Sequence, residues 1–145
     1  MKRVILAILC CVMLIGAIPV ASFAAVGGGD IAVPYYNNTS RVSTIFTIDA
    51  SGNATLKLSC IGKSGMTTGI TAVSRIDKLN SDGSWSVVNI GTQNNTWVDS
   101  STSLVLSKTH TATVERGTYR AVVNYTVSGS GGANDTIENI IERTY

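Results

Sequence analysis

Every second residue across 119–127 is aromatic or aliphatic, in the order Tyr119, Ala121, Val123, Tyr125, Val127. Polar residues, among them Arg120, Asn124 and Thr126, lie between them. Successive side chains of a β-strand point to opposite faces, so this alternation predicts a strand with one face in a core. It is the cleanest alternation in the chain, and it favours an all-β fold.

Six further segments carry weaker versions of the same pattern. They are 41–48, 54–60, 70–79, 85–90, 104–115 and 135–145. Turn signals separate them, of which Asp82-Gly83 is the strongest, and polar loops are expected at 62–69, 91–99 and 128–134. Seven short strands at this spacing indicate a sandwich or a small barrel.

The last of these segments has a helical alternative. Asp135 would cap the helix with Glu138 three residues later, and Ile137, Ile140 and Ile141 would form one apolar stripe. We choose a strand, because the segment follows a hairpin-sized loop and holds adjacent β-branched residues.

Composition narrows the class of protein. The chain has 145 residues, enough for one domain, with 16 Ser, 17 Thr and only 14% charged residues. This composition excludes a coiled coil, a collagen-like repeat, a polybasic nucleic-acid binder and a disulfide-dense miniprotein.

The N-terminus has the three parts of a secretory signal peptide. Lys2 and Arg3 precede an uncharged apolar run at 4–18, and Ser22-x-Ala24 is a small-residue cleavage pattern. The run is shorter than the roughly 20 residues that span a bilayer. We therefore expect a signal peptide at 1–24, cleavage after Ala24 and secretion.

Removal of that segment changes the charge and the cysteine count. Nine basic and nine acidic residues remain, so the exported chain is neutral, and we expect it to bind neither nucleic acid nor membrane. Cys60 is then the one cysteine left, in phase with Leu56 and Leu58, which predicts a small buried side chain and no internal disulfide. Residues 25–40, with Gly27, Gly28, Gly29 and Pro34, are predicted to be a flexible leader to a domain at 41–145.

Two motifs resemble the immunoglobulin-like fold. Leu56-x-Leu58-x-Cys60 resembles its second strand, and Glu115-x-Gly117-x-Tyr119-x-Ala121 resembles its tyrosine corner. In such a corner the Tyr119 ring would be buried and its hydroxyl bonded to nearby backbone after a turn at Gly117. Ala121 stands where the second core cysteine would be, so the inter-sheet bridge is absent.

More broadly, the chain resembles small exported Ig-like β-sandwich proteins of Gram-positive bacteria that carry an uncharacterised domain. The resemblance rests on the signal peptide, Gly83-Ser84-Trp85 and the Gly-x-Tyr-Arg strand at 117–120. It implies an Ig-like antiparallel β-sandwich of about seven strands and brings no activity with it.

No catalytic or metal site is predicted. His110, the single histidine, is in phase with Leu106, Ala112 and Val114, which favours a satisfied, partly buried side chain over a general base. The chain has no G-x-S-x-G elbow. Cys60 and His110 alone cannot hold a transition metal. Asp77, Asn80 and Asp82 could contact calcium, but they lack a closing glutamate, so a plain turn is expected and no cofactor is implied.

The aromatic side chains are the candidate binding residues. Trp85, Trp97, Tyr35 and Tyr36 could form a platform for a sugar or a peptide. In the alternative interpretation Trp85 covers its own hairpin and Trp97 fixes the polar loop to the sheet edge. The sequence therefore predicts a secreted, non-enzymatic binding or surface-interaction module whose partner is a glycan or a protein at the cell surface. A bacteriocin-like antagonist is the alternative function, and a hydrolase with an unrecognised site ranks last.

Overall fold

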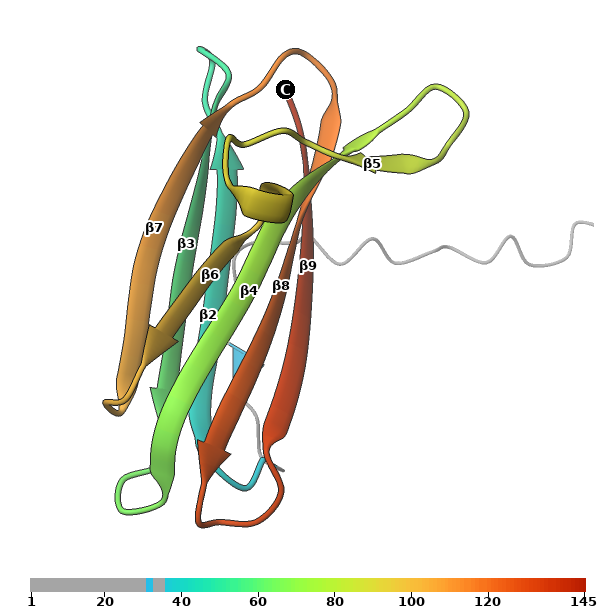
Figure 1. Cartoon of the computed structure of the whole chain (residues 1–145). Coiled ribbons are helices and arrows are strands. Elements are labelled where there is room, and N and C mark those ends of the chain that lie inside the picture. Colours follow the sequence, from blue (N-terminus) through green and yellow to red (C-terminus); the bar gives the residue numbers. More distant parts are fainter. Residues whose placement is uncertain (1–30, 33–35) are drawn as a thin grey trace, which may run out of the picture.

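The computed structural model describes residues 31–32 and 36–145, and two antiparallel sheets face each other in a β-sandwich (Figure 1). The predicted all-β sandwich is confirmed. The predicted signal peptide, its cleavage after Ala24, and Tyr35 lie outside the described residues.

The first sheet has the strand order β1-β2-β3-β7. Its strands are β1 (Ile31–Ala32), β2 (Thr39–Ile48), β3 (Asn53–Gly62) and β7 (Val105–Thr113). Three long strands make up most of this sheet, because β1 pairs only with Arg41 and Val42 of β2.

The second sheet has five strands, with β4 and β8 at its centre. Its strands are β4 (Thr67–Leu79), β5 (Trp85–Val87), β6 (Trp97–Ser101), β8 (Thr118–Gly129) and β9 (Asp135–Thr144). One edge of β4 pairs with β8, and the other edge pairs with β6 along 70–74 and with β5 along 77–79.

The core lies between the sheets and is formed by the alternating apolar residues. Its largest fully buried side chains include Tyr119, Tyr125 and Phe46. The Tyr125 hydroxyl is hydrogen-bonded to Thr44 Oγ1 at 2.8 Å, and Asn139 Nδ2 donates to the same Thr44 oxygen at 2.9 Å. These bonds satisfy the polar groups that cross the core.

The segment at 135–145 is a strand, and the helical alternative is wrong. Ile137 and Ile141 are 5% and 7% exposed, whereas Ile140 between them is 49% exposed. This period of two is that of β9, which pairs with β8 from Asp135 to Thr144.

Several predicted boundaries differ from the structure. The strand β4 begins at Thr67 and β8 ends at Gly129, within the predicted loops at 62–69 and 128–134, and β5 ends at Val87 rather than at residue 90. Residues 97–99 were assigned to a polar loop, but Trp97–Ser101 is the strand β6. The domain was expected to begin at Arg41, but β2 begins at Thr39, and Asn38 before it is fully buried.

A buried carboxylate, Asp135, fixes the chain just before β2. It accepts hydrogen bonds from the backbone N–H groups of Asn37 and Asn38 at 2.8 and 2.7 Å and from Thr39 Oγ1 at 2.8 Å. Burial alone would raise the pKa of Asp135, but the bonds from Thr39, Asn38 and Asn37 outweigh it and hold that pKa below its usual value. We call this group the Asp135 clasp.

The residues singled out for structural roles lie in the sandwich as follows. Tyr119 is buried, and its hydroxyl donates to the backbone carbonyl of Glu115 at 2.9 Å. Gly117 has φ of +156°, and a side chain there would contact Lys78 and Tyr119. Cys60 is a free, buried cysteine, and burial raises the pKa of its thiol to about 11, which leaves it unreactive as a nucleophile at neutral pH.

Candidate functional site

The outward-facing side of the second sheet carries a charged cluster that we call the outer-face site. It consists of Arg75 and Asp77 of β4, Trp85 of β5 and Arg120 of β8. The sheet register places Asp77 opposite Arg120 and Leu79 opposite Trp85, so all four side chains emerge on one face.

One carboxylate organises both guanidinium groups of this site. Asp77 is only 2% exposed, and its two oxygens are bound separately, Oδ1 by Arg75 Nε at 3.0 Å and Oδ2 by Arg120 Nε at 2.9 Å. The Arg120 guanidinium also lies over the Trp85 ring, 4.4 Å from its centroid. A desolvated carboxylate is costly unless it is paired, and here two arginines pair with it.

The cluster retains donors and a net positive charge. Its two arginines and one aspartate sum to +1, and the exposed Glu142 of β9 lies opposite Arg120 on the same face. Both arginines bind Asp77 through Nε. Within the described part of the chain, the terminal Nη atoms of Arg75 and Arg120 make no hydrogen bond. Each guanidinium therefore keeps N–H groups for a ligand.

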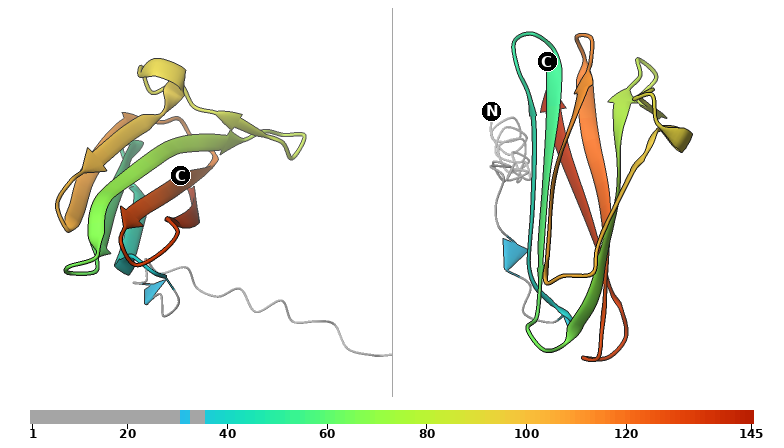
Figure 2. Two further views of the ribbon diagram at one scale, coloured as in Figure 1. Left: turned by 60° about the horizontal axis from the view of Figure 1, so that its bottom comes forward. Right: turned by 60° about the vertical axis from the view of Figure 1, so that its left-hand side comes forward.

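A loop at 89–96 interrupts the strand edge beside Arg75. Val88 N donates to Ile76 O at 2.8 Å, and Trp97 lies opposite Ser74, so the two ends of the loop flank Arg75. An uninterrupted strand would place residue 90 opposite Ser74, so the loop inserts seven residues. It contains the short helix η1 (Gln93–Asn95) and rises from the outer side of β4, as both views of Figure 2 show.

The inserted loop is polar, and two of its asparagines adopt left-handed backbone conformations. Gln93 and Asn94 are exposed and Asn95 is half-buried, and within the described residues their side chains make no hydrogen bond. Asn94 and Asn95 have φ of 57° and 52°, in the left-handed region that favours glycine. We call these residues, 89–96, the insertion loop.

Aliphatic side chains continue the outer face next to the cluster. Val98 of β6 is 68% exposed, Val87 of β5 is 49% exposed and Val73 of β4 is 38% exposed. The face therefore combines apolar surface, an aromatic ring, two guanidinium groups and amides, which is a composition typical of recognition surfaces.

Trp97, in contrast, lies on the inner side of β6. It packs against the hydrophobic core and stacks on His110 of β7, with ring centroids 4.7 Å apart and planes at 9°. His110 Nε2 is 2.6 Å from Asp99 Oδ2, and both side chains are largely buried. We call Trp97, Asp99 and His110 the seam, because they join β6 of the second sheet to β7 of the first.

The three predicted binding aromatics that the structure describes do not form one platform. Trp85 lies at the end of the sandwich where β4 ends and β8 begins. Tyr36 precedes β2 at the opposite end and packs partly buried against the core, while Trp97 belongs to the seam. Tyr35 lies outside the described residues.

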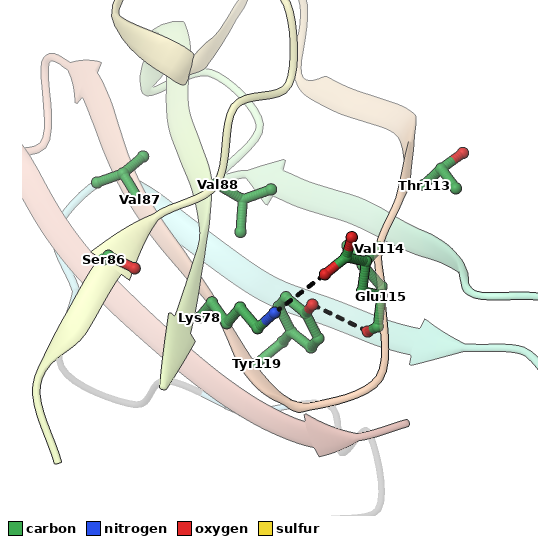
Figure 3. Close-up of a pocket in the computed structure, with 8 residues that line it drawn as sticks. All are labelled: Lys78, Ser86, Val87, Val88, Thr113, Val114, Glu115 and Tyr119. Carbon is green, nitrogen blue, oxygen red and sulfur yellow. Dashed lines mark hydrogen bonds and ion pairs between the residues drawn. The ribbon is translucent and has the colours of Figure 1, made fainter. Parts of the chain in front are cut away.

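A separate pocket of about 230 Å³ lies on the inner side of the β4–β5 hairpin (Figure 3). Its lining includes Lys78, Val88, Val114 and Tyr119. Lys78 Nζ is 3.6 Å from Glu115 Oε2, but Glu115 is 90% exposed, so solvent screens this pair. The pocket therefore combines apolar side chains with one solvent-screened ion pair.

The seam does not form a catalytic relay. His110 is held by Asp99 and Trp97, and the inward Ser74, opposite Trp97, has a buried hydroxyl with no hydrogen-bond partner in the described residues. Asp77 is bound by arginines and Asp82 by Ser84, so the three residues considered for calcium do not converge. In 31–32 and 36–145, no group of three His, Cys, Asp or Glu residues could hold a metal ion.

The same residues include no helix long and apolar enough to cross a membrane.

Comparison of this chain with known proteins identifies no relative. No family model, no curated protein and no solved structure matches this chain.

Arg75, Asp77 and Arg120 are the site residues that sequence reasoning missed. Ile76 and Asp77 are both buried in succession, and this break in the alternation of β4 is visible only in the structure. A charged residue that is buried on the outer face of a strand needs a charged partner.

Proposed function

We propose that this chain is an exported, non-enzymatic binding module, and that the outer-face site is its binding surface. The exported state is supported by the signal-peptide pattern of residues 1–24. The binding role is supported by the outer-face site, where exposed aliphatic side chains surround guanidinium groups that retain free donors.

The proposal includes an immunoglobulin-like architecture. The order β2-β3-β7 corresponds to strands A, B and E of that fold, and β4-β8-β9 corresponds to C, F and G. The Tyr119 hydroxyl bond to Glu115 is the local bond expected of a tyrosine corner at the start of strand F. In such folds recognition is carried by loops and sheet faces on a rigid sandwich.

One observation carries the functional proposal: the buried Asp77 holds two arginines, one of them stacked on Trp85. A buried ion cluster adds little net stability compared with apolar residues of similar volume. What the cluster does provide is a pair of guanidinium groups in fixed positions on an accessible face. Preorganised side chains of this kind lose little entropy when a ligand binds.

Binding to immobilised hyaluronan, mucin and dextran tests the proposal. The chain is recovered from the medium of an exporting host, and an N-terminus at Ala25 supports the signal-peptide part. We expect at least one polymer to bind, and Trp85→Ala to weaken that binding by about tenfold or more. Binding that is unchanged in Trp85→Ala, with the fold intact, contradicts the proposed surface.

A further inference from the structure

We propose that the outer-face site recognises a carboxylate carried on a sugar ring, as in a uronic-acid polymer. The inference rests on the proposed function and names its ligand class. The carboxylate would be held by the terminal Nη groups of Arg75 and Arg120, and the sugar ring would lie beside Trp85 and the insertion loop.

The charge and geometry of the arginine pair favour a single oxyanion. The guanidinium fork matches a carboxylate through two parallel N–H···O bonds. Arg75 and Arg120 flank one buried carboxylate at 3.0 and 2.9 Å, which fixes both groups close together on the same face. Asp77 neutralises one of the two guanidinium charges and Glu142 lies opposite Arg120 on the same face, so the pair has room for no more than one further negative charge.

The position of Trp85 favours a ligand whose negative charge is carried on the sugar ring and not between sugar units. The Arg120 guanidinium is 4.4 Å from the centre of the Trp85 ring, so the anionic group and the apolar face of the ligand must lie within about one sugar ring. A uronic acid has its carboxylate on a ring carbon. In a phosphodiester polymer the charge lies between the sugar units, farther from the stacking face.

The insertion loop supplies the groups that sugar hydroxyls need. Gln93 and Asn94 are exposed amides and Asn95 is a half-buried one, and each is both a donor and an acceptor. The loop adds no buried residue to the fold, and two of its asparagines have positive φ.

Hyaluronan oligosaccharides and their carboxyl-reduced counterparts test the inference by calorimetry. We expect the wild-type chain to bind hyaluronan at least tenfold more tightly than the reduced form, and Arg75→Gln or Arg120→Gln to remove that preference. Arg75→Lys retains the charge without the fork and should lose most of it. Arg116→Gln is the matched control, because Arg116 lies 5.1 Å over the Tyr145 ring but outside the site.

Each outcome separates the ligand class from the proposed function. Equal binding of hyaluronan and its reduced form, still lost in Trp85→Ala, overturns the carboxylate assignment and leaves the binding surface standing. Preferential binding of poly(glycerol phosphate) or dextran sulfate overturns it in favour of another oxyanion. A preference that Arg116→Gln abolishes as fully as Arg75→Gln, or no hyaluronan binding at all, also overturns the inference. Thermal unfolding of each variant confirms that it is folded.

Discussion

The two tryptophans lie along the same edge of β4 and serve opposite sides of the sheet. Trp85, opposite Leu79, points outward and lies under the Arg120 guanidinium. Trp97, opposite Ser74, points inward and stacks on His110. One belongs to the surface that we propose binds a ligand, and the other closes the core.

The insertion loop accounts for this difference. The tryptophans are twelve positions apart, and because side chains alternate with a period of two, an uninterrupted strand would place both on one face. The loop inserts seven residues, an odd number, and so reverses the phase of β6 relative to β5. The odd length of the insertion loop is therefore the reason that Trp97 packs into the core while Trp85 faces outward.

The largest expected effect is a difference in the stability of the protein when each tryptophan is replaced by alanine. Trp97→Ala should lower the free energy of unfolding by about 3 kcal/mol, because it removes a ring packed against the core and leaves a cavity. Trp85→Ala should cost less than about 1 kcal/mol, since its ring lies on the outer face. Urea denaturation of both variants measures the difference, and equal losses would contradict the assignment of one ring to each region.

The Asp135 clasp should affect stability without affecting binding. Asp135→Asn should cost about 2 kcal/mol at neutral pH, because it weakens charge-assisted bonds from Asn37, Asn38 and Thr39. The folded-state pKa of Asp135 lies below its usual value, so this stabilisation is complete above that value and is lost as the pH falls through the lower folded value.

Unfolding followed from pH 7 to pH 2 measures this acid dependence. The variant should lose less stability than the wild type as the pH falls. An acid dependence that is identical in both proteins would show that Asp135 does not contribute to it.

The seam should respond more weakly than its tryptophan. His110→Phe should cost about 1 kcal/mol, because it removes the 2.6 Å bond to Asp99 and keeps a ring that can stack on Trp97. Glycan binding should stay at the wild-type level, since His110 contacts the inner side of β6. A variant with normal stability and impaired binding would place the functional surface at the seam.

Deletion of residues 89–95 gives the smallest expected change in stability and a clear change in binding. Seven residues are removed, so Val88 remains opposite Ile76 and Trp97 remains opposite Ser74 in a continuous strand. We expect the free energy of unfolding to change by less than about 1 kcal/mol. Loss of Gln93, Asn94 and Asn95 should weaken glycan binding, and affinity equal to that of the wild type would exclude the loop from the site.

The sequence predicted those parts of the fold whose partners are close along the chain. The Tyr119 bond reaches only to Glu115, and the turn before Trp85 depends on Asp82 and Gly83. The strand at Asp135–Thr144 also followed from local alternation and loop length.

The parts that were missed depend on distant partners. Trp97–Ser101 reads as a polar loop because its inward Asp99 is satisfied only by His110. The role of Asp77 was missed because it depends on Arg120, 43 residues away, as well as on the nearby Arg75. A buried charge cannot be recognised from a local pattern until the strand that brings its counter-ion is known.

The most direct test uses the two tryptophans as separate reporters. Trp97→Phe leaves Trp85 as the one indole, and Trp85→Phe leaves Trp97. On titration with hyaluronan, fluorescence should change in the variant that retains Trp85 and stay constant in the variant that retains Trp97. A response from Trp97 with none from Trp85 would contradict the outer face as the binding surface.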